Sequence, residues 1–87
     1  MWNMSTVISD TDARLNVAAN VNRILEDRGM TQADLARLTG ENAMAISRVC
    51  RGTNLVNVGM LARIAEALEC TVDELLKKSW KKVSRTA

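Results

Sequence analysis

Apolar side chains recur along this chain three or four residues apart, which is the period of a helix that buries one face. The clearest stripe lies in residues 12–28 and comprises Val17, Val21, Ile24 and Leu25. Either Ser9 together with Asp12, or Thr11 alone, can cap the start of this helix. Gly29 can end it, because glycine readily adopts the left-handed conformation that closes many helices. The preceding residues show no sustained period, so we expect residues 1–11 to form a flexible arm.

Cap residues divide the next segment into two shorter helices. The first starts at Thr31, which has Asp34 three residues later as in a capping box, and ends at Gly40. The second starts after Asn42, a favourable N-cap, and ends before Gly52. The residues predicted to face the core from these two helices are Leu35, Ala36, Leu38, Ile46 and Val49.

Two further helices follow a loop at residues 53–56. Asn57 caps the fourth helix, and Thr71 with Glu74 repeats the capping-box pattern at the start of the fifth. The apolar stripes of these helices are Val58, Leu61, Ile64, Ala65 and Leu68 in the fourth and Val72, Leu75 and Leu76 in the fifth. The chain is therefore predicted to be all-α, with a compact orthogonal bundle of five short helices over residues 12–76.

Composition agrees with a small helical core. The chain has 87 residues, of which 47% are apolar, and it has no proline, tyrosine or phenylalanine. Leu, Ile, Val, Met and Ala must therefore build a core near the lower size limit for unaided folding. No apolar run approaches the roughly 18 residues of a membrane span, and the N-terminus lacks the features of a signal peptide. We expect a cytoplasmic protein.

The sequence shows no pattern typical of an enzyme or a metal site. Cys50 and Cys70 are separated by 19 residues, and the chain has no histidine, so neither a zinc site nor a CxxC motif can form. There is also no glycine-rich phosphate loop and no serine or cysteine beside a base at recognisable spacing. We predict a non-enzymatic protein without a metal or other cofactor, in which both thiols are reduced and structural.

Positive charge is concentrated at the end of the chain. Residues 1–76 carry seven basic and ten acidic residues, whereas residues 77–87 carry five basic residues and no acidic one. This asymmetry indicates an anionic partner without identifying it. We expect the tail at residues 77–87 to be mobile and to add affinity without selectivity.

Residues 31–52 combine two helices with a very short link around Gly40, so the helices must cross at a large angle. Ala36 offers a small side chain where the backbones approach, and Gly40 tolerates the positive φ of the turn. Ile46 and Val49 anchor the second helix in the core. A second face of this helix is also defined by helical spacing but is mostly polar and basic. It consists of Met44, Ser47, Arg48 and Arg51.

This pattern resembles the phage lambda repressor and Cro-like family of helix-turn-helix DNA-binding domains, which includes the XRE-type transcriptional regulators. The likeness spans residues 14–76, and its matching positions are Gln32, Leu35, Ala36, Gly40, Ile46, Ser47, Arg48, Val49, Arg51, Gly52, Leu61, Ile64, Ala65, Leu68 and residues 71–76. The sequence departs from the family pattern in three places. Glu41 replaces an apolar residue that plugs the turn, residues 55–56 replace a polar-Pro pair, and Cys50 replaces an acidic residue, which removes a charge that would repel phosphate.

The resemblance implies a sequence-specific regulator of transcription, most simply a repressor, that reads the major groove of double-stranded DNA with its third helix. The residues that it assigns to DNA binding are Gln32, Asn42, Ala43, Met44, Ser47, Arg48, Arg51, Thr53 and Asn54. Bases are assigned to residues 43, 44, 47 and 48, although Met44 has the alternative of turning inward beside Glu41. A protein-interaction module on the same fold, such as an antitoxin-like or adaptor protein, is the alternative function.

We also expect a homodimer on a pseudo-palindromic operator, because several apolar residues have no evident place in the core. These residues are Leu55, Val56, Leu76 and Trp80. As an alternative, Leu55 or Val56 folds back into the space beside Glu41. The sequence indicates no small-molecule ligand and no membrane partner.

Overall fold

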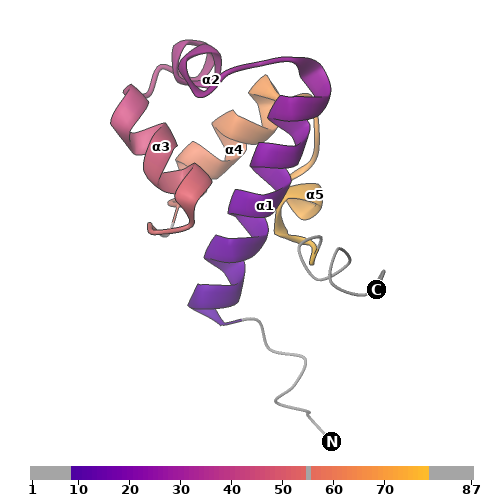
Figure 1. The fold of residues 1–87 in the computed structure, drawn as a ribbon. Helices are drawn as coiled ribbons and strands as arrows, with labels where there is room; N and C mark the ends of the chain where they lie inside the picture. Colours follow the sequence, from indigo (N-terminus) through magenta and orange to yellow (C-terminus); the bar gives the residue numbers. More distant parts are fainter. Residues whose placement is uncertain (1–8, 55, 79–87) are drawn as a thin grey trace, which may run out of the picture.

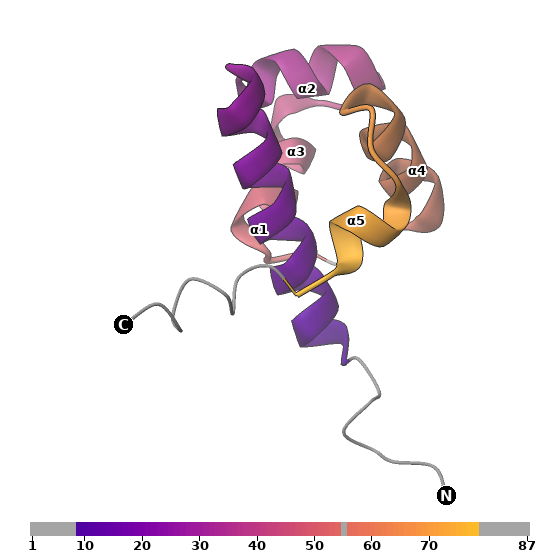
Figure 2. The same ribbon diagram turned by 90° about the vertical axis from the view of Figure 1, so that its right-hand side faces the viewer.

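Five α-helices make up the ranges that the computed structural model describes, residues 9–54 and 56–78. They are α1 (Asp10–Arg28), α2 (Gln32–Thr39), α3 (Ala43–Arg51), α4 (Val58–Ala67) and α5 (Val72–Leu76). Helix α1 packs against α3 and α5, α2 packs against α3 and α4, and α4 packs against α5 (Figures 1 and 2). The all-α bundle is as predicted. Within these ranges, no helix has the length and apolar character needed to cross a membrane.

Each of these helices starts at a side chain that the sequence identified as a cap. The caps are Ser9, Thr31, Asn42, Asn57 and Thr71. The Ser9 hydroxyl accepts from the Asp12 N–H at 3.0 Å, so the alternative cap at Thr11 is wrong. Helix α1 consequently begins two residues earlier than predicted, and Asp10 and Thr11 are helical rather than part of an arm.

Two of the helices begin with reciprocal capping boxes. In α2 the Thr31 N–H donates to the Asp34 carboxylate at 3.0 Å, and the Asp34 N–H donates to the Thr31 hydroxyl at 3.1 Å. The backbone hydrogen bond from Thr31 lowers the pKa of Asp34, and the equivalent bond from Thr71 lowers the pKa of Glu74. Because each folded-state pKa lies below its unfolded value, this stabilisation is present at neutral pH and is lost as the pH falls through the acid range.

The apolar stripes converge on one core, with two exceptions. Its buried members from the predicted stripes are Val17, Val21, Ile24, Leu25, Leu35, Ala36, Ile46, Val49, Ile64, Ala65, Leu68 and Leu75. Leu38 is 55% exposed and Val58 is 84% exposed, so their predicted burial is wrong. Thr39, four residues after Leu35, is buried instead, and its hydroxyl donates to the Leu35 carbonyl at 2.8 Å. Val58 is the first residue of α4.

Two buried asparagines of α1 hold the end of α5, and no sequence pattern predicted them. The Asn20 amide donates to the carbonyls of Leu75 and Lys77, both at 2.8 Å. The Asn16 amide donates to the Leu76 carbonyl at 2.9 Å. The last carbonyls of a helix have no partner within the helix, so these side chains satisfy groups that would otherwise be left without one in the interior.

Candidate nucleic-acid interface

The link between α2 and α3 consists of three residues that reverse the chain sharply. Gly40 has a φ of +76°, a conformation that L side chains rarely adopt, which explains the glycine at this position. The Glu41 N–H donates to the Ala36 carbonyl at 3.1 Å, and Asn42 then caps α3. Figure 1 shows α3 descending from the end of α2 at a wide angle. The predicted helix-turn-helix is therefore present.

Glu41 joins this turn to α4 through an ion pair. Its carboxylate accepts from the Arg63 guanidinium at 2.6 Å, and its side chain is only 21% exposed. The position where the family pattern has an apolar plug is thus occupied by the acidic member of an ion pair that joins the turn to α4. We infer that this pair sets the distance between the turn and α4.

The outward face of α3 is exposed as its spacing predicted. Ile46 and Val49 are buried beneath the helix, whereas Met44 is 62% exposed, so the alternative in which Met44 turns inward is wrong. One Arg48 nitrogen lies 3.3 Å from the Met44 sulfur. One helical turn later, the Arg51 guanidinium donates to the Ser47 hydroxyl at 3.0 Å. These contacts, each between residues four apart, arrange both arginines along the same side of the helix.

An open depression lies where the start of α2 meets this face of α3. It has a volume of about 630 Å³ and is lined by Gln32, Ala33, Ala43, Met44, Ser47, Arg48 and Arg51. Six of the nine predicted DNA-binding residues therefore meet in one place. Ala33 was missed, and the available signal was its position directly after Gln32 in the first turn of α2.

The other three predicted residues lie at the two ends of α3. Asn42 acts as a cap, because its side-chain oxygen accepts from the Ala45 N–H at 2.7 Å. Thr53 and Asn54 are exposed in the loop that follows Gly52. The Thr53 N–H and hydroxyl both donate to the Arg48 carbonyl, at 3.1 and 3.3 Å, which fixes the start of this loop on the helix.

Helix α1 holds the C-terminal end of α3 through two polar side chains. The Asn22 amide donates to the Cys50 carbonyl at 2.9 Å, and the Arg14 Nε donates to the Gly52 carbonyl at 3.3 Å. Cys50 itself is buried, since it lies four residues after Ile46 on the core face. Its expected effect on phosphate repulsion stays a prediction. Burial raises the pKa of the Cys50 thiol, which keeps the thiol neutral at physiological pH.

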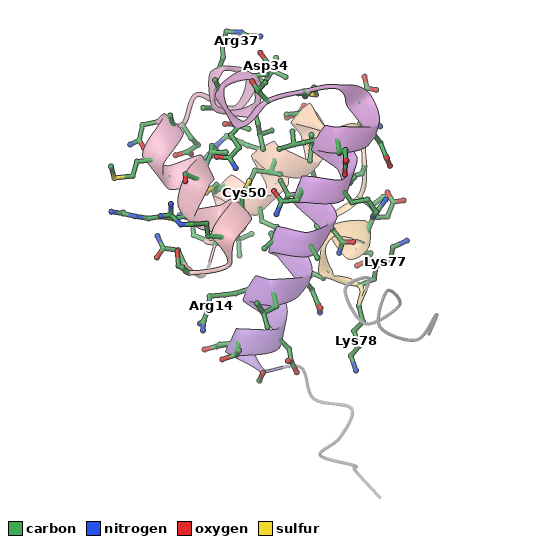
Figure 3. All side chains as sticks on the ribbon, viewed as in Figure 1. Arg14, Asp34, Arg37, Cys50, Lys77 and Lys78 are labelled. Carbon is green, nitrogen blue, oxygen red and sulfur yellow. The ribbon has the colours of Figure 1, made fainter. Side chains whose placement is uncertain are left out.

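Two of the predicted dimer residues contribute to the core. Val56 and Leu76 are half-buried and pack against it, so the premise that they have no place there is wrong. Leu55 and Trp80 lie outside the described residues. Lys77 and Lys78 begin the basic tail as exposed side chains (Figure 3). The large apolar side chains that are exposed in the described ranges are Leu15, Leu38, Met44 and Val58.

A second depression, of about 300 Å³, lies between α1 and the segment that joins α4 to α5. Charged residues dominate its lining, which consists of Arg23, Ile24, Asp27, Arg28, Glu69, Cys70, Glu74 and Lys77. Opposite charges pair here, with Arg28 donating to Glu69 at 3.1 Å. Burial raises the pKa of the Cys70 thiol. Among the residues with described positions, no group of His, Cys, Asp and Glu side chains is arranged to hold a metal ion.

Comparisons with known proteins agree with this geometry. Residues 20–78 match the sequence model of the Cro/C1-type HTH DNA-binding domain. The fold is similar to that of a hypothetical transcription factor, NHTF, from Neisseria, with a TM-score of 0.76 and 24% identity over 87% of each chain. It is also similar to an HTH_3 family transcriptional regulator from Vibrio cholerae, with a TM-score of 0.74 and 21% identity over 87% of this chain and 43% of that one. A search of curated proteins gave no match.

Proposed function

This chain belongs to the Cro/C1-type helix-turn-helix DNA-binding family, and on that premise we propose that it is a transcriptional repressor that binds a specific double-stranded DNA sequence. The observation that carries the proposal is the outward face of α3, where two arginines and exposed small or apolar side chains border an open depression. Repression requires only that the protein occupy an operator, since a bound protein blocks access to the promoter.

The shape of α3 suits insertion into the major groove. A helix with its side chains is about 10–12 Å wide, and the major groove of B-DNA is about 12 Å wide. Ile46 and Val49 are buried and hold α3 against the core. The open depression between the start of α2 and the outward face of α3 leaves room for the DNA backbone that borders the groove. Gln32, at the start of α2, is then directed toward a phosphate, which the free N–H groups of a helix N-terminus also favour.

Base recognition is assigned to the N-terminal part of α3. Arg48 can donate two hydrogen bonds to O6 and N7 of guanine, which is the commonest specific contact. In the free protein its partner is the Met44 sulfur, a weak acceptor that a base can replace at little cost. Ala43 and Met44 offer apolar contact to thymine methyl groups, and Ser47 adds a weakly selective hydroxyl. Contacts to phosphates are assigned to Arg51, Thr53 and Asn54 at the C-terminal end of α3. At its N-terminal end, the amide of the cap residue Asn42 can reach the DNA backbone or an adenine edge.

Arg48→Ala is expected to weaken specific binding by about 1–3 kcal/mol and to relax the base preference at one position of each half-site. The reason is the loss of one bidentate contact, since Arg48 is exposed and does not support the core. The measurement is selection of bound sequences from a random DNA pool, followed by titration of the selected duplex with both proteins.

Arg28→Ala is the matched control for this experiment. It removes the same charge, but from the second depression, where Arg28 pairs with Glu69. The control should retain the base preference of the wild type. If Arg48→Ala also retained the full preference and the affinity of the control, Arg48 would not read bases.

We further propose that two copies bind a pseudo-palindromic operator, with half-sites roughly 34–36 Å apart. Val58, at the start of α4, is 84% exposed and offers an apolar side chain for an interface between the copies. Sedimentation at tens of micromolar should therefore give the mass of a dimer, at least when the operator is present. A monomer both free and on DNA would contradict the two-fold arrangement.

A further inference from the structure

The arginines in the described ranges fall into two groups according to their ion pairs. Those that pair with a carboxylate are Arg23, Arg28, Arg37 and Arg63. Those that pair with no carboxylate among the described residues are Arg14, Arg48 and Arg51. Arg48 and Arg51 line the depression on α3. Arg14 is therefore the one arginine of this second group that lies outside the helix-turn-helix.

Arg14 is held beside the loop that follows α3. Its Nε donates to the Gly52 carbonyl and its Nη2 donates to the Thr11 hydroxyl, both at 3.3 Å. The Gly52 carbonyl belongs to the peptide unit that leads into Thr53, so the guanidinium lies next to the first residue of the proposed phosphate-binding loop. Figure 3 shows Arg14 directed toward the side of α1 on which α3 lies.

Close packing between α1 and Gly52 fixes this position. A Cβ atom built on Gly52 would lie 3.4 Å from the Leu15 Cδ2 and 3.5 Å from the Ala18 Cβ, and Gly52 has a φ of +73°. Gly52, at the start of the loop, therefore packs directly against α1 at Leu15, the residue after Arg14, and at Ala18. This contact uses the first half of α1, which precedes residue 20, where the match to the family begins.

We propose that Arg14 is a further DNA-binding residue that contacts a backbone phosphate next to the one bound by Thr53 and Asn54. The two hydrogen bonds orient the guanidinium without neutralising it, because both acceptors are uncharged oxygens. Neither Nη1 proton donates to a described residue, so Nη1 can donate to a phosphate oxygen, and arginine is a favoured residue for phosphate recognition. Asp10 lies one turn earlier on α1 but forms no ion pair with Arg14 in the structure.

The consequence is that the DNA interface extends from α3 across the loop onto α1. This inference rests on the proposed function, since it adds a contact to the same duplex. A phosphate contact fixes the register of the protein but carries no direct sequence information. Arg14 should therefore add affinity for every duplex, whereas Arg48 discriminates among sequences.

The test is Arg14→Gln, which removes the charge but keeps a side-chain donor for the Gly52 carbonyl. We expect affinity for the selected duplex and for a random duplex to fall by about the same factor, three- to tenfold. The slope of log affinity against log salt should fall by about 0.9 per bound protomer. Arg14→Lys, which keeps the charge, should retain most of the affinity and the wild-type slope.

Arg28→Gln is the control, because it removes a paired arginine from the other end of α1. Equal affinities and slopes for Arg14→Gln and Arg28→Gln would overturn the inference while leaving the proposed function intact. A wild-type protein that bound no duplex would instead overturn the proposed function and the inference with it. Thermal unfolding of each variant distinguishes the loss of a DNA contact from the loss of the fold. If Arg14→Lys lost as much affinity as Arg14→Gln and the salt slope stayed unchanged, Arg14 would only position the loop.

Discussion

Raising the salt concentration from 50 to 200 mM is expected to weaken duplex binding by about 10³–10⁵-fold, because the proposed dimer would make on the order of 6–10 phosphate contacts. Each Lys or Arg side chain that neutralises a phosphate releases a condensed counterion from the DNA, and this release makes the affinity depend on salt. Arg51, Arg14 and the lysines at the start of the basic tail are the charged groups that we assign to phosphates. Titration of one duplex at several salt concentrations gives the slope directly.

A random duplex provides the control for the salt experiment. Its affinity should be lower at every salt concentration, but its slope should be nearly as steep, because the phosphate contacts do not depend on sequence. An affinity that stayed constant between 50 and 200 mM would contradict electrostatic binding. The result would then favour the alternative, a protein-interaction module such as an antitoxin-like or adaptor protein.

The expected salt dependence comes from the placement of charge and not from its total. The described ranges contain nine basic residues, seven arginines and two lysines, against ten acidic ones. The net charge of this part of the chain therefore gives no indication of an anionic partner. The ion pairs make the difference, since they occupy the arginines on other surfaces and leave those around α3 with their full charge.

The sequence predicted those features of the fold that depend on local interactions. Each N-cap bonds to a backbone N–H three residues later, so the type and spacing of two residues suffice to identify it. The burial of α3 follows the same logic, because Ile46 and Val49 lie one turn apart. Cys50 lies four residues after Ile46, and that spacing was the available signal for its burial.

Contacts between distant residues could not be predicted in this way. Glu41 and Arg63 are 22 positions apart, and Arg14 and Gly52 are 38 apart. Neither pair belongs to a periodic pattern, and the acceptor in the second is a backbone carbonyl, which every residue has. The direction of Met44 was open for another reason, since methionine fits both core gaps and exposed surfaces. The candidate site was thus predictable along α3 but not where α1 and α4 support it.

Asn20→Leu is expected to lower the free energy of unfolding by about 2–4 kcal/mol, a large fraction of the roughly 5–15 kcal/mol of a typical domain. Asn20 is fully buried, and its amide is the donor to the Leu75 and Lys77 carbonyls. Leucine has a similar volume but no donor, so these carbonyls would lose a partner at the end of a helix of only five residues. Such a short helix cannot persist without tertiary support.

Denaturation with urea, followed by far-ultraviolet circular dichroism, measures this change, and Arg23→Ala is its control. Arg23 donates to the Asn20 side-chain oxygen at 3.2 Å, and its side chain is 46% exposed. Removing it leaves both carbonyls bonded and takes away one hydrogen bond, so it should cost about 1 kcal/mol, less than Asn20→Leu. Because the main contacts of α5 are with α1 and α4, the folded fraction of Asn20→Leu should bind DNA with wild-type affinity. A change in stability no larger than that of Arg23→Ala would show that water satisfies the α5 carbonyls as well as Asn20 does. If Asn20→Leu were fully folded but bound DNA more weakly than the wild type, the end of α5 would be coupled to α3 through α1.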